Sequence, residues 1–420
     1  MVVSNTGYPR GLAAPALLPH IVSLMARRDA RAPRDPLAAE PSARKVYRLR
    51  PPERTGAVSD RLRSMLDPEQ LAAVSGASGR SLILAAAGSG KTRTIVALLA
   101  HLVECGTSPE RIMLVTFTRR AAREMVQRAE RTAGVDLGAV TAGTFHSVAR
   151  RLLRRYGPLV GVPTTATVLD AEDQAELLGM ARDEVLAGVA RPPSMPKPSA
   201  LVGMIGLAAE LGRPLEDVVI DSNPRLGDRL ELIAAIAEGY AARKRNMAGL
   251  DYADLLVAAD RLLAEHDRVR RRLAAAYPWV LVDELHDTSP LQARMVEAIA
   301  GDGGNLVAVA DPDQSWRGAD PQVVQRFAAA PETRVFPLST NYRSTPEIVA
   351  LAQETLPDGN PFGKRMRAQR PPTATMPVIA HLGSVPDEAA FVVQRIGELI
   401  TEGRSPGDIA VLYRAHHHSV

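Results

Sequence analysis

The sequence predicts an α/β protein whose core is a doubly wound, mostly parallel β-sheet. Two observations lead to this prediction: short apolar runs alternate with helical patterns, and one of those runs breaks into a glycine-rich loop followed by a helical segment. Residues 149–249 add a third observation, because they are helix-rich without a convincing strand and so predict a helical subdomain inserted into the α/β domain. The expected strands, in chain order, are Ser81–Leu84, Ile112–Phe117, Trp279–Asp283, Leu306–Ala310 and Val335–Leu338.

Residues 1–63 form a basic, Pro- and Arg-rich leader that we expect to be disordered. They hold 12 Lys and Arg against 5 Asp and Glu, although the net charge of the whole chain is only +4. A tail of this charge can add non-specific affinity for nucleic acid. Charge alone therefore does not indicate DNA binding, and the evidence for it must come from motifs. Ordered structure is expected from Leu66, because Asp67 is followed by Pro68, a typical helix start.

Composition indicates a soluble globular protein in a reducing, cytoplasmic setting. Hydrophobic residues make up 46% of the chain, and Cys105 is its only cysteine, so no intrachain disulfide can form. No apolar run approaches the ~20 residues of a membrane span. The moderately apolar segment 11–26 is interrupted by Pro15 and Pro19, so we expect neither a signal peptide nor a membrane anchor.

The glycine-rich loop that follows Ser81–Leu84 has the pattern of a phosphate-binding loop, and a helical segment, 91–104, comes after it. Successive backbone N–H groups and the helix N-terminus would bind polyphosphate, with Lys91 on the β- and γ-phosphates and the Thr92 hydroxyl on Mg²⁺. A chance glycine turn is the alternative interpretation, and Ala85 stands where the simple motif has its first glycine. The predicted ATP-binding residues of the loop are Ala85, Ala86, Ala87, Gly88, Ser89, Gly90, Lys91 and Thr92.

A second signal is the apolar run Val280–Val282, which ends in the carboxylates Asp283 and Glu284. They would lie at the carboxyl edge of the sheet, where the phosphate loop also opens. Asp283 would then complete the Mg²⁺ shell, and Glu284 would polarise the water that attacks the γ-phosphate. An ordinary acidic pair at a strand end is the alternative.

In this order the motifs resemble the superfamily 1 DNA helicases of the UvrD/Rep type, including the actinobacterial helicase–nuclease motor subunits. The resemblance runs from Leu66 to the last residue. It implies two RecA-like domains that open and close around ATP. The expected organisation is a first RecA-like domain over 64–148 and 250–340, the inserted helices over 149–249, and the start of the second RecA-like domain over 341–420.

The resemblance assigns further residues to the nucleotide. Gln70 would contact the adenine edge, although it also suits a plain capping role, and both roles can hold. Arg93 would lie near the base, and Gln314 would sense the γ-phosphate. Tyr342 would stack on adenine, and Arg343 would act as an arginine finger.

Four residues are assigned to single-stranded DNA in the same way: Phe117, Thr144, His146 and Trp316. Bases of any sequence can stack on an aromatic side chain, and each stacked base contributes ~1–3 kcal/mol of binding free energy. Alone, Phe117 would be a core residue and His146 a surface histidine; the resemblance implies DNA contacts instead. It also implies an ATP-driven 3′-to-5′ translocase that splits duplexes at junctions, in DNA repair or recombination.

The chain departs from this family in three places. His286 stands where the family usually has glutamine, and the segment from Gln314 to Trp316 is about three residues shorter than in close relatives. Two motifs that lie beyond Ala410–Arg414 in the family are absent, so we expect an incomplete second RecA-like domain. Within it, we expect a helix near Pro386–Thr401 and a strand at Ile409–Tyr413.

Three functions therefore compete. The first is a helicase or translocase, acting alone or completed by a partner subunit. The second is a truncated ATP- and DNA-binding module that cannot unwind DNA without a partner chain. A phosphate-loop kinase is disfavoured, because Glu284 suits activation of water.

Overall fold

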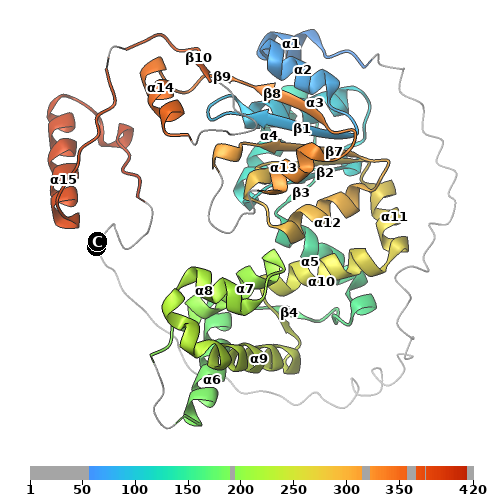
Figure 1. Ribbon diagram of the computed structural model, residues 1–420. Coiled ribbons are helices and arrows are strands. Elements are labelled where there is room, and N and C mark those ends of the chain that lie inside the picture. The colour runs from blue at the N-terminus through green and yellow to red at the C-terminus, as the bar shows by residue number, and fades with distance from the viewer. Residues whose placement is uncertain (1–55, 190–193, 315–321, 357–365, 374, 414–420) are drawn as a thin grey trace, which may run out of the picture.

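The computed structural model describes residues 56–189, 194–314, 322–356, 366–373 and 375–413. Its centre is a six-stranded sheet in the order β3-β2-β6-β7-β1-β8, with every neighbouring pair parallel (Figure 1). The strands are β1 (Arg80–Ala85), β2 (Ile112–Val115), β3 (Thr141–Gly143), β6 (Trp279–Val282), β7 (Asn305–Ala310) and β8 (Arg334–Leu338). The α/β prediction and its five strands are confirmed, and β3 is an addition.

Helices cover both faces of this sheet, because alternate residues of each central strand point to opposite sides. Ile83 and Leu114 pack into the core on one face, whereas Leu82 and Met113 pack into the core on the other. On the first face lie α2 (Pro68–Gly76), α3 (Lys91–Glu104) and α4 (Arg119–Ala133). On the second face lie α5 (Phe145–Tyr156), α10 (Tyr252–Glu265), α11 (Asp267–Ala276), α12 (Pro290–Ala300) and α13 (Gln322–Ala329).

Ordered structure begins before Leu66, contrary to our expectation. The helix α1 (Asp60–Met65) buries Leu62 completely in the same core as α2 and α3, and Val58 packs beside it. The predicted boundary of the leader, residue 63, therefore lies too far along the chain. A six-residue helix with one buried leucine is too short to show a periodic hydrophobic pattern in the sequence. Residues 1–55 lie outside the described part of the chain.

The inserted region is a helical layer beside the sheet domain (Figure 1). It consists of α6 (Ala171–Ala187), α7 (Pro198–Leu211), α8 (Leu215–Ser222) and α9 (Leu230–Asn246), with a core of its own around Leu178 and Ile236. Two short strands, β4 (Thr167–Val168) and β5 (Gly249–Leu250), pair where the chain enters and leaves this layer. Val160 and Val162 still pack in the sheet core, so we place the start of the insertion after them.

Beyond the sheet, β9 (Thr340–Asn341) pairs with β10 (Arg367–Ala368), and the helices α14 (Pro346–Glu354) and α15 (Val385–Thr401) follow. The helix expected near Pro386–Thr401 is confirmed as α15. The strand expected at Ile409–Tyr413 is wrong, because those residues form no strand. A short apolar run becomes a strand only when a neighbour supplies backbone partners, and the described residues bring none beside it.

Among the residues that the structure describes, no helix is both long enough and apolar enough to cross a bilayer.

Candidate functional site

The predicted nucleotide residues meet at the edge of the sheet where the carboxyl ends of β1, β6 and β7 lie. A cleft of about 390 Å³ opens there between the phosphate loop and the segment after β9. Parallel strands place all their carboxyl ends at one edge, which is why residues far apart in the chain converge. The cleft is lined by Gly88, Gly90, Lys91, Thr92, Arg128, Glu284, Gln314, Tyr342 and Arg343.

The phosphate loop depends on two of its glycines. Gly88 has φ +69°, and a Cβ there would lie 2.8 Å from Asn341 Nδ2. Gly90 has φ +86°, and a Cβ there would lie 2.6 Å from Gln70 Nε2. Ala85 is instead the last residue of β1 and has no left-handed backbone, so alanine fits the motif's first position.

The first turn of α3 offers its backbone N–H groups to the cleft. No side chain caps this helix, which begins at Lys91 immediately after Gly90. Uncapped N–H groups at a helix N-terminus form a ready site for a phosphate. The backbone geometry of this turn fits the predicted polyphosphate cradle, and phosphate binding stays a prediction.

Asp311 holds two of the predicted residues at the cleft. Its carboxylate is buried, with Oδ2 3.0 Å from Lys91 Nζ, and the same oxygen accepts a hydrogen bond of 2.5 Å from Gln314 Nε2. Asp311 follows β7 and Lys91 begins α3, so this carboxylate ties two elements of the site together. Gln314 and Lys91 thus approach the phosphate position as a unit.

The acidic pair follows β6, as the sequence predicts. Asp283 is buried, and its Oδ1 atom has no hydrogen-bond partner among the described residues. Burial raises the pKa of Asp283 to about 7, with the charge of Glu284 adding to the effect and Lys91 opposing it. A buried carboxylate oxygen without a partner, at the same edge as the Thr92 hydroxyl, offers the hard oxygen donors that Mg²⁺ prefers, so these residues fit that ion.

Glu284 adopts a left-handed backbone, with φ 55° and ψ 48°. A residue other than glycine takes this conformation at some energetic cost, typically where function requires the geometry. The turn directs the chain into a short 3-10 helix, Leu285–Asp287, and leaves the Glu284 side chain at the cleft.

His286 replaces the family's usual glutamine without breaking the site. Its side chain is buried, and Nδ1 accepts a hydrogen bond of 3.0 Å from the backbone N–H of Asp311. Nδ1 is therefore unprotonated, and Nε2, which lies 3.4 Å from a Glu284 carboxylate oxygen, carries the proton. Burial lowers the pKa of His286, which favours this neutral form. The imidazole is therefore hydrogen-bonded to the Asp311 backbone and lies beside Glu284, whose Oε2 atom has no hydrogen-bond partner among the described residues.

Gln70 performs the capping role. Its backbone N–H donates to Asp67 Oδ1 at 2.8 Å, its Oε1 accepts from the Asp67 backbone N–H, and Nε2 donates to Ser89 O at 2.9 Å. The capping interpretation is confirmed, and contact with adenine stays a prediction. The buried amide also fixes α2 against the phosphate loop.

The segment after β8 closes onto the phosphate loop. Asn341 Nδ2 donates to Ala87 O at 2.8 Å, and the Tyr342 backbone N–H donates to Gly88 O at 3.0 Å. The Tyr342 hydroxyl donates to Asp67, and burial together with that carboxylate raises the pKa of Tyr342 to about 12, against the lowering effect of Arg93. Tyr342 thus lies beside the loop, with Arg93 close enough to act on it.

One cleft residue was not predicted from the sequence. Arg128 lies on α4, its guanidinium is 3.6 Å from Glu124, and it also lines the nucleotide cleft. Arginines are frequent along α4, so spacing alone does not distinguish this one.

A second cavity, of about 660 Å³, lies between the sheet domain and the helical insertion. Phe117, which is half-exposed, lines it together with Tyr252 at the start of α10. Tyr252 was not predicted, because nothing in its local pattern distinguishes it from a core aromatic. Both aromatics line the same space, and aromatic rings suit stacking of bases.

The two predicted residues at the start of α5 have different roles in the structure. Thr144 caps the helix, with its side chain accepting from the Ser147 backbone N–H. His146 packs edge-on against Tyr252, with ring centroids 5.5 Å apart, and burial lowers its pKa. Its Nε2 atom is buried without a hydrogen-bond partner in the described part of the chain. Trp316, the fourth predicted DNA contact, lies outside the described residues.

A buried ion network joins the insertion to this cavity. Lys244 Nζ on α9 lies 2.5 Å from Asp251 Oδ2 and 2.6 Å from Asp254 Oδ2. Tyr240 also donates its hydroxyl hydrogen to Asp251, at 3.1 Å. Asp251 caps α10 directly before Tyr252, so the network fixes the element that carries this aromatic.

Comparisons with known proteins agree with this geometry. The model for the UvrD/REP helicase N-terminal domain matches residues 66–332. The chain is 31% identical over 369 residues to the ATP-dependent DNA helicase PcrA of Staphylococcus aureus, covering 84% of this chain and 48% of that protein. It is 32% identical to DNA helicase II of Salmonella typhimurium, covering 84% and 48%. It is 35% identical to the ATP-dependent DNA helicase UvrD2 of Mycobacterium bovis, covering 85% and 53%. The chain thus spans about half the length of the curated relatives it matches.

Proposed function

Because this chain belongs to the UvrD/Rep helicase family, we propose that it hydrolyses ATP to move along single-stranded DNA. The observation that carries the proposal is the convergence of Lys91, Glu284 and Arg343 on one cleft, although they are far apart in the sequence. A cation at the phosphate loop, a carboxylate for water and a cation from the facing segment are the groups that phosphoryl transfer to water needs.

Each residue then has a chemical task. Lys91 binds the β- and γ-phosphates in place of Asp311. Asp311 then holds only Gln314, which it positions against the γ-phosphate. Glu284 orients the attacking water and accepts its proton, and Arg343 stabilises charge that develops on the phosphoryl group. Thr92 and Asp283 would hold Mg²⁺, which neutralises phosphate charge when bound.

The hydrogen-bond chain around Asp311 supports coupling between hydrolysis and movement. His286 accepts a hydrogen bond from the Asp311 backbone N–H and lies 3.4 Å from Glu284, and the Asp311 side chain holds Gln314. Replacement of the Lys91–Asp311 ion pair by a Lys91–phosphate contact would change the partners of Gln314. We propose that this change couples hydrolysis to movement.

We propose that single-stranded DNA binds at the second cavity, the one lined by Phe117 and Tyr252. Phe117 and Tyr252 line a cavity whose charged residues, within the part of the chain that the structure describes, are all acidic: Glu210, Asp251 and Asp287. Such a cavity accepts the faces of bases more readily than phosphates. This arrangement favours a strand that turns its bases inward here.

The finer assignments rest on the family resemblance alone. We propose 3′-to-5′ movement, strand separation at duplex junctions and a role in DNA repair or recombination. We also propose a cytoplasmic location, which the single cysteine supports.

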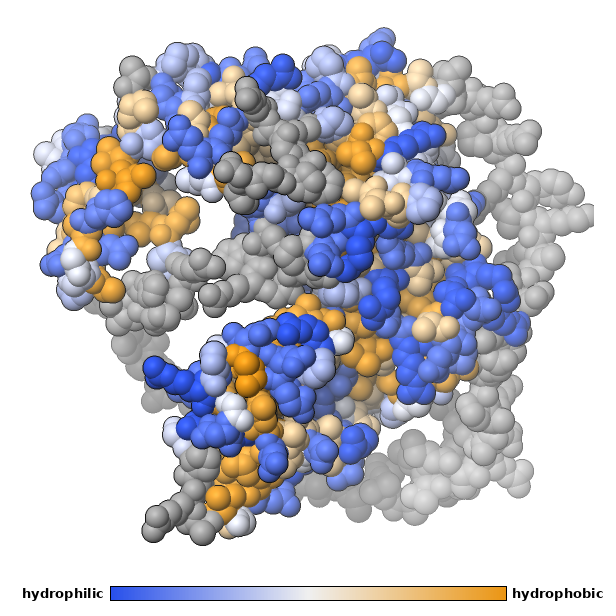
Figure 2. Space-filling model, in the orientation of Figure 1, coloured by the Kyte–Doolittle hydropathy of each residue, from blue (hydrophilic) through white to orange (hydrophobic). Residues whose placement is uncertain are grey.

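We propose further that residues 376–413 pack against another protein surface, such as a partner subunit. Val378, Val393 and Leu412 are 86%, 70% and 94% exposed, and α15 buries none of its residues. Figure 2 shows apolar side chains gathered at the surface over this part of the chain. Static light scattering over a range of concentrations should show association; a monomer at all concentrations would contradict self-association and leave a different protein partner as the expected one.

Displacement of a protein block tests the translocase directly. Oligonucleotides carry streptavidin at either the 3′ or the 5′ end, and its release by ATP is timed. Release from the 5′ end alone supports 3′-to-5′ movement, and duplex substrates with a 3′ tail then test unwinding. ATP and DNA binding without any release would support the alternative, an ATP- and DNA-binding module that needs a partner chain.

A further inference from the structure

We propose that Arg150 and Arg154 on α5, with Thr164 and Thr165 across a small pocket, bind the phosphodiester backbone of single-stranded DNA. This site would extend the DNA contacts beyond the aromatic cavity and lies apart from every residue that the sequence motifs single out. The inference rests on the proposed function, because it takes single-stranded DNA as the ligand.

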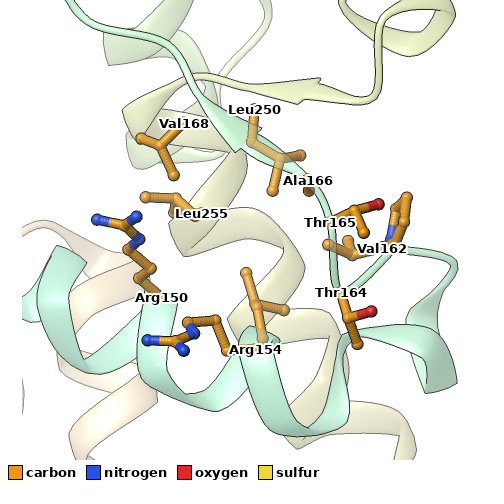
Figure 3. A pocket seen from close by; sticks show the side chains of 11 residues that line it. Arg150, Arg154, Val162, Thr164, Thr165, Ala166, Val168, Leu250 and Leu255 are labelled. Atoms are coloured by element: carbon orange, nitrogen blue, oxygen red, sulfur yellow. The ribbon is translucent and has the colours of Figure 1, made fainter. Parts of the chain in front are cut away.

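The pocket is a built feature of the surface. It has a volume of about 140 Å³ and lies between α5, the loop before β4 and the start of α10. Figure 3 shows the side chains of Arg150 and Arg154 at one side of the pocket and those of Thr164 and Thr165 at the other. The remaining lining is mostly apolar: Leu153, Val162, Pro163, Ala166, Val168, Leu250 and Leu255. Two guanidinium groups and two hydroxyls around an apolar floor suit a phosphate attached to a sugar and a base.

The two arginines are available for a ligand. The side chain of neither makes a hydrogen bond or an ion pair with any described residue, and both are exposed. Their neighbours on the same helix are engaged, because Arg151 donates to Thr141 at 3.2 Å and Arg155 lies 5.4 Å from the ring centroid of Tyr156. The helix α5 therefore carries two arginines whose side chains contact other residues and two whose side chains have no partner among the described residues.

The position of the pocket continues the proposed DNA track. His146, Arg150 and Arg154 follow one another at four-residue intervals on α5, which places them on one side of the helix about 6 Å apart. His146 contacts Tyr252 at the start of α10, and the pocket is lined by Leu250 and Leu255 on either side of Tyr252. A strand leaving the aromatic cavity past His146 would reach Arg150 next.

Charge favours nucleic acid at this pocket. Among the described residues, no lysine or arginine lines the aromatic cavity, and the three charged residues that do are acidic. A strand with its bases in that cavity still carries a full negative charge at every phosphate, which requires cations beyond the cavity. Arg150 and Arg154 are unpaired cations at the adjoining position. An acidic peptide could use the same cations, so the experiment includes one.

The test compares two double variants on one helix. Arg150→Ala with Arg154→Ala removes the pocket cations, and Arg151→Ala with Arg155→Ala removes the same charge beside them. Affinity for fluorescent oligo(dT) of increasing length is measured from 50 to 200 mM salt, together with ATP affinity as a check on folding. Binding of fluorescent poly-glutamate is measured in parallel.

Loss of two phosphate contacts should lower the slope of log affinity against log salt by about 1.4. The wild-type chain should therefore lose about 7-fold more affinity for long oligo(dT) over this salt range than the pocket variant. The control variant should keep the wild-type slope, and all three proteins should bind ATP equally.

Three results would overturn the inference. Equal salt slopes for the pocket and control variants would remove Arg150 and Arg154 from the track while leaving the proposed function intact. Loss of poly-glutamate binding with unchanged oligo(dT) binding would assign the pocket to an acidic protein partner. Absence of oligo(dT) binding by the wild-type chain would contradict the proposed function itself.

Discussion

Replacement of Lys244 by methionine should destabilise the junction between the helical insertion and the sheet domain. Lys244 is 6% exposed, and its ammonium lies within 2.6 Å of both Asp251 and Asp254. Methionine keeps most of the side-chain volume and removes the charge. The buried Asp251 and the half-buried Asp254 are then left without their cation.

The magnitude follows from the cost of an unpaired buried charge. Burial alone raises the pKa of Asp251, but Lys244 outweighs it and lowers that pKa; for Asp254, burial and the charge of Asp251 prevail and raise the pKa. The one ammonium therefore stabilises a pair of carboxylates that repel each other. Removal of one partner from such a buried site typically costs about 3–5 kcal/mol. That is a large part of the ~5–15 kcal/mol that stabilises a typical domain.

A rescue variant separates charge from packing. Adding Asp251→Asn and Asp254→Asn to Lys244→Met removes all three charges, and asparagine still caps the start of α10. Replacement of a whole buried ion network is often close to neutral, so the triple variant should recover most of the lost stability.

Urea unfolding gives the free energy of unfolding, and amide hydrogen exchange locates the change. Protection should fall first in α9 and the start of α10, which the network joins. A loss below 1 kcal/mol for Lys244→Met would refute the reasoning. So would a triple variant as unstable as the single one, because packing rather than charge would then be responsible.

Substitutions at four further residues test the nucleotide cleft. Lys91→Ala should abolish ATP binding in a fluorescent-nucleotide titration; retained affinity would contradict the phosphate-loop assignment. Glu284→Gln should keep ATP affinity and slow hydrolysis by about 10²–10⁴-fold in a phosphate-release assay, as expected when a general base is lost. Gly88→Ala should cost about 1–2 kcal/mol of stability because of its left-handed backbone, measured against wild type by urea unfolding; an unchanged midpoint would contradict this. His286→Gln should keep most of the hydrolysis rate, whereas His286→Ala should lower it by leaving the Asp311 N–H unpaired; equal rates for the two variants would contradict the role of this hydrogen bond.

Strands and nucleotide residues could be predicted from the sequence because their signals are local. A buried central strand must be a short apolar run, and a phosphate loop must carry Gly90, Lys91 and Thr92 in direct succession. Parallel strands bring their carboxyl ends together, so a strand that ends in Asp283 and Glu284 places both near the loop.

What could not be predicted depends on contacts between distant segments. The three-residue strand β3 is defined only by pairing with β2, and α1 by the burial of Leu62. Arg128 and Tyr252 have ordinary residue patterns around them, and only the fold brings them to the two cavities. The strand expected at Ile409–Tyr413 failed for the same reason, since an apolar run does not specify its partner.

Stimulation of ATP hydrolysis by single-stranded DNA tests the central claim most directly. The steady-state rate of phosphate release is measured with saturating ATP and Mg²⁺, with and without oligo(dT), in parallel with Lys91→Ala. The joint action of the nucleotide cleft and the aromatic cavity predicts a rate that rises with oligo(dT) and disappears in the variant. A wild-type rate that is the same with and without DNA would contradict the coupling of the two sites.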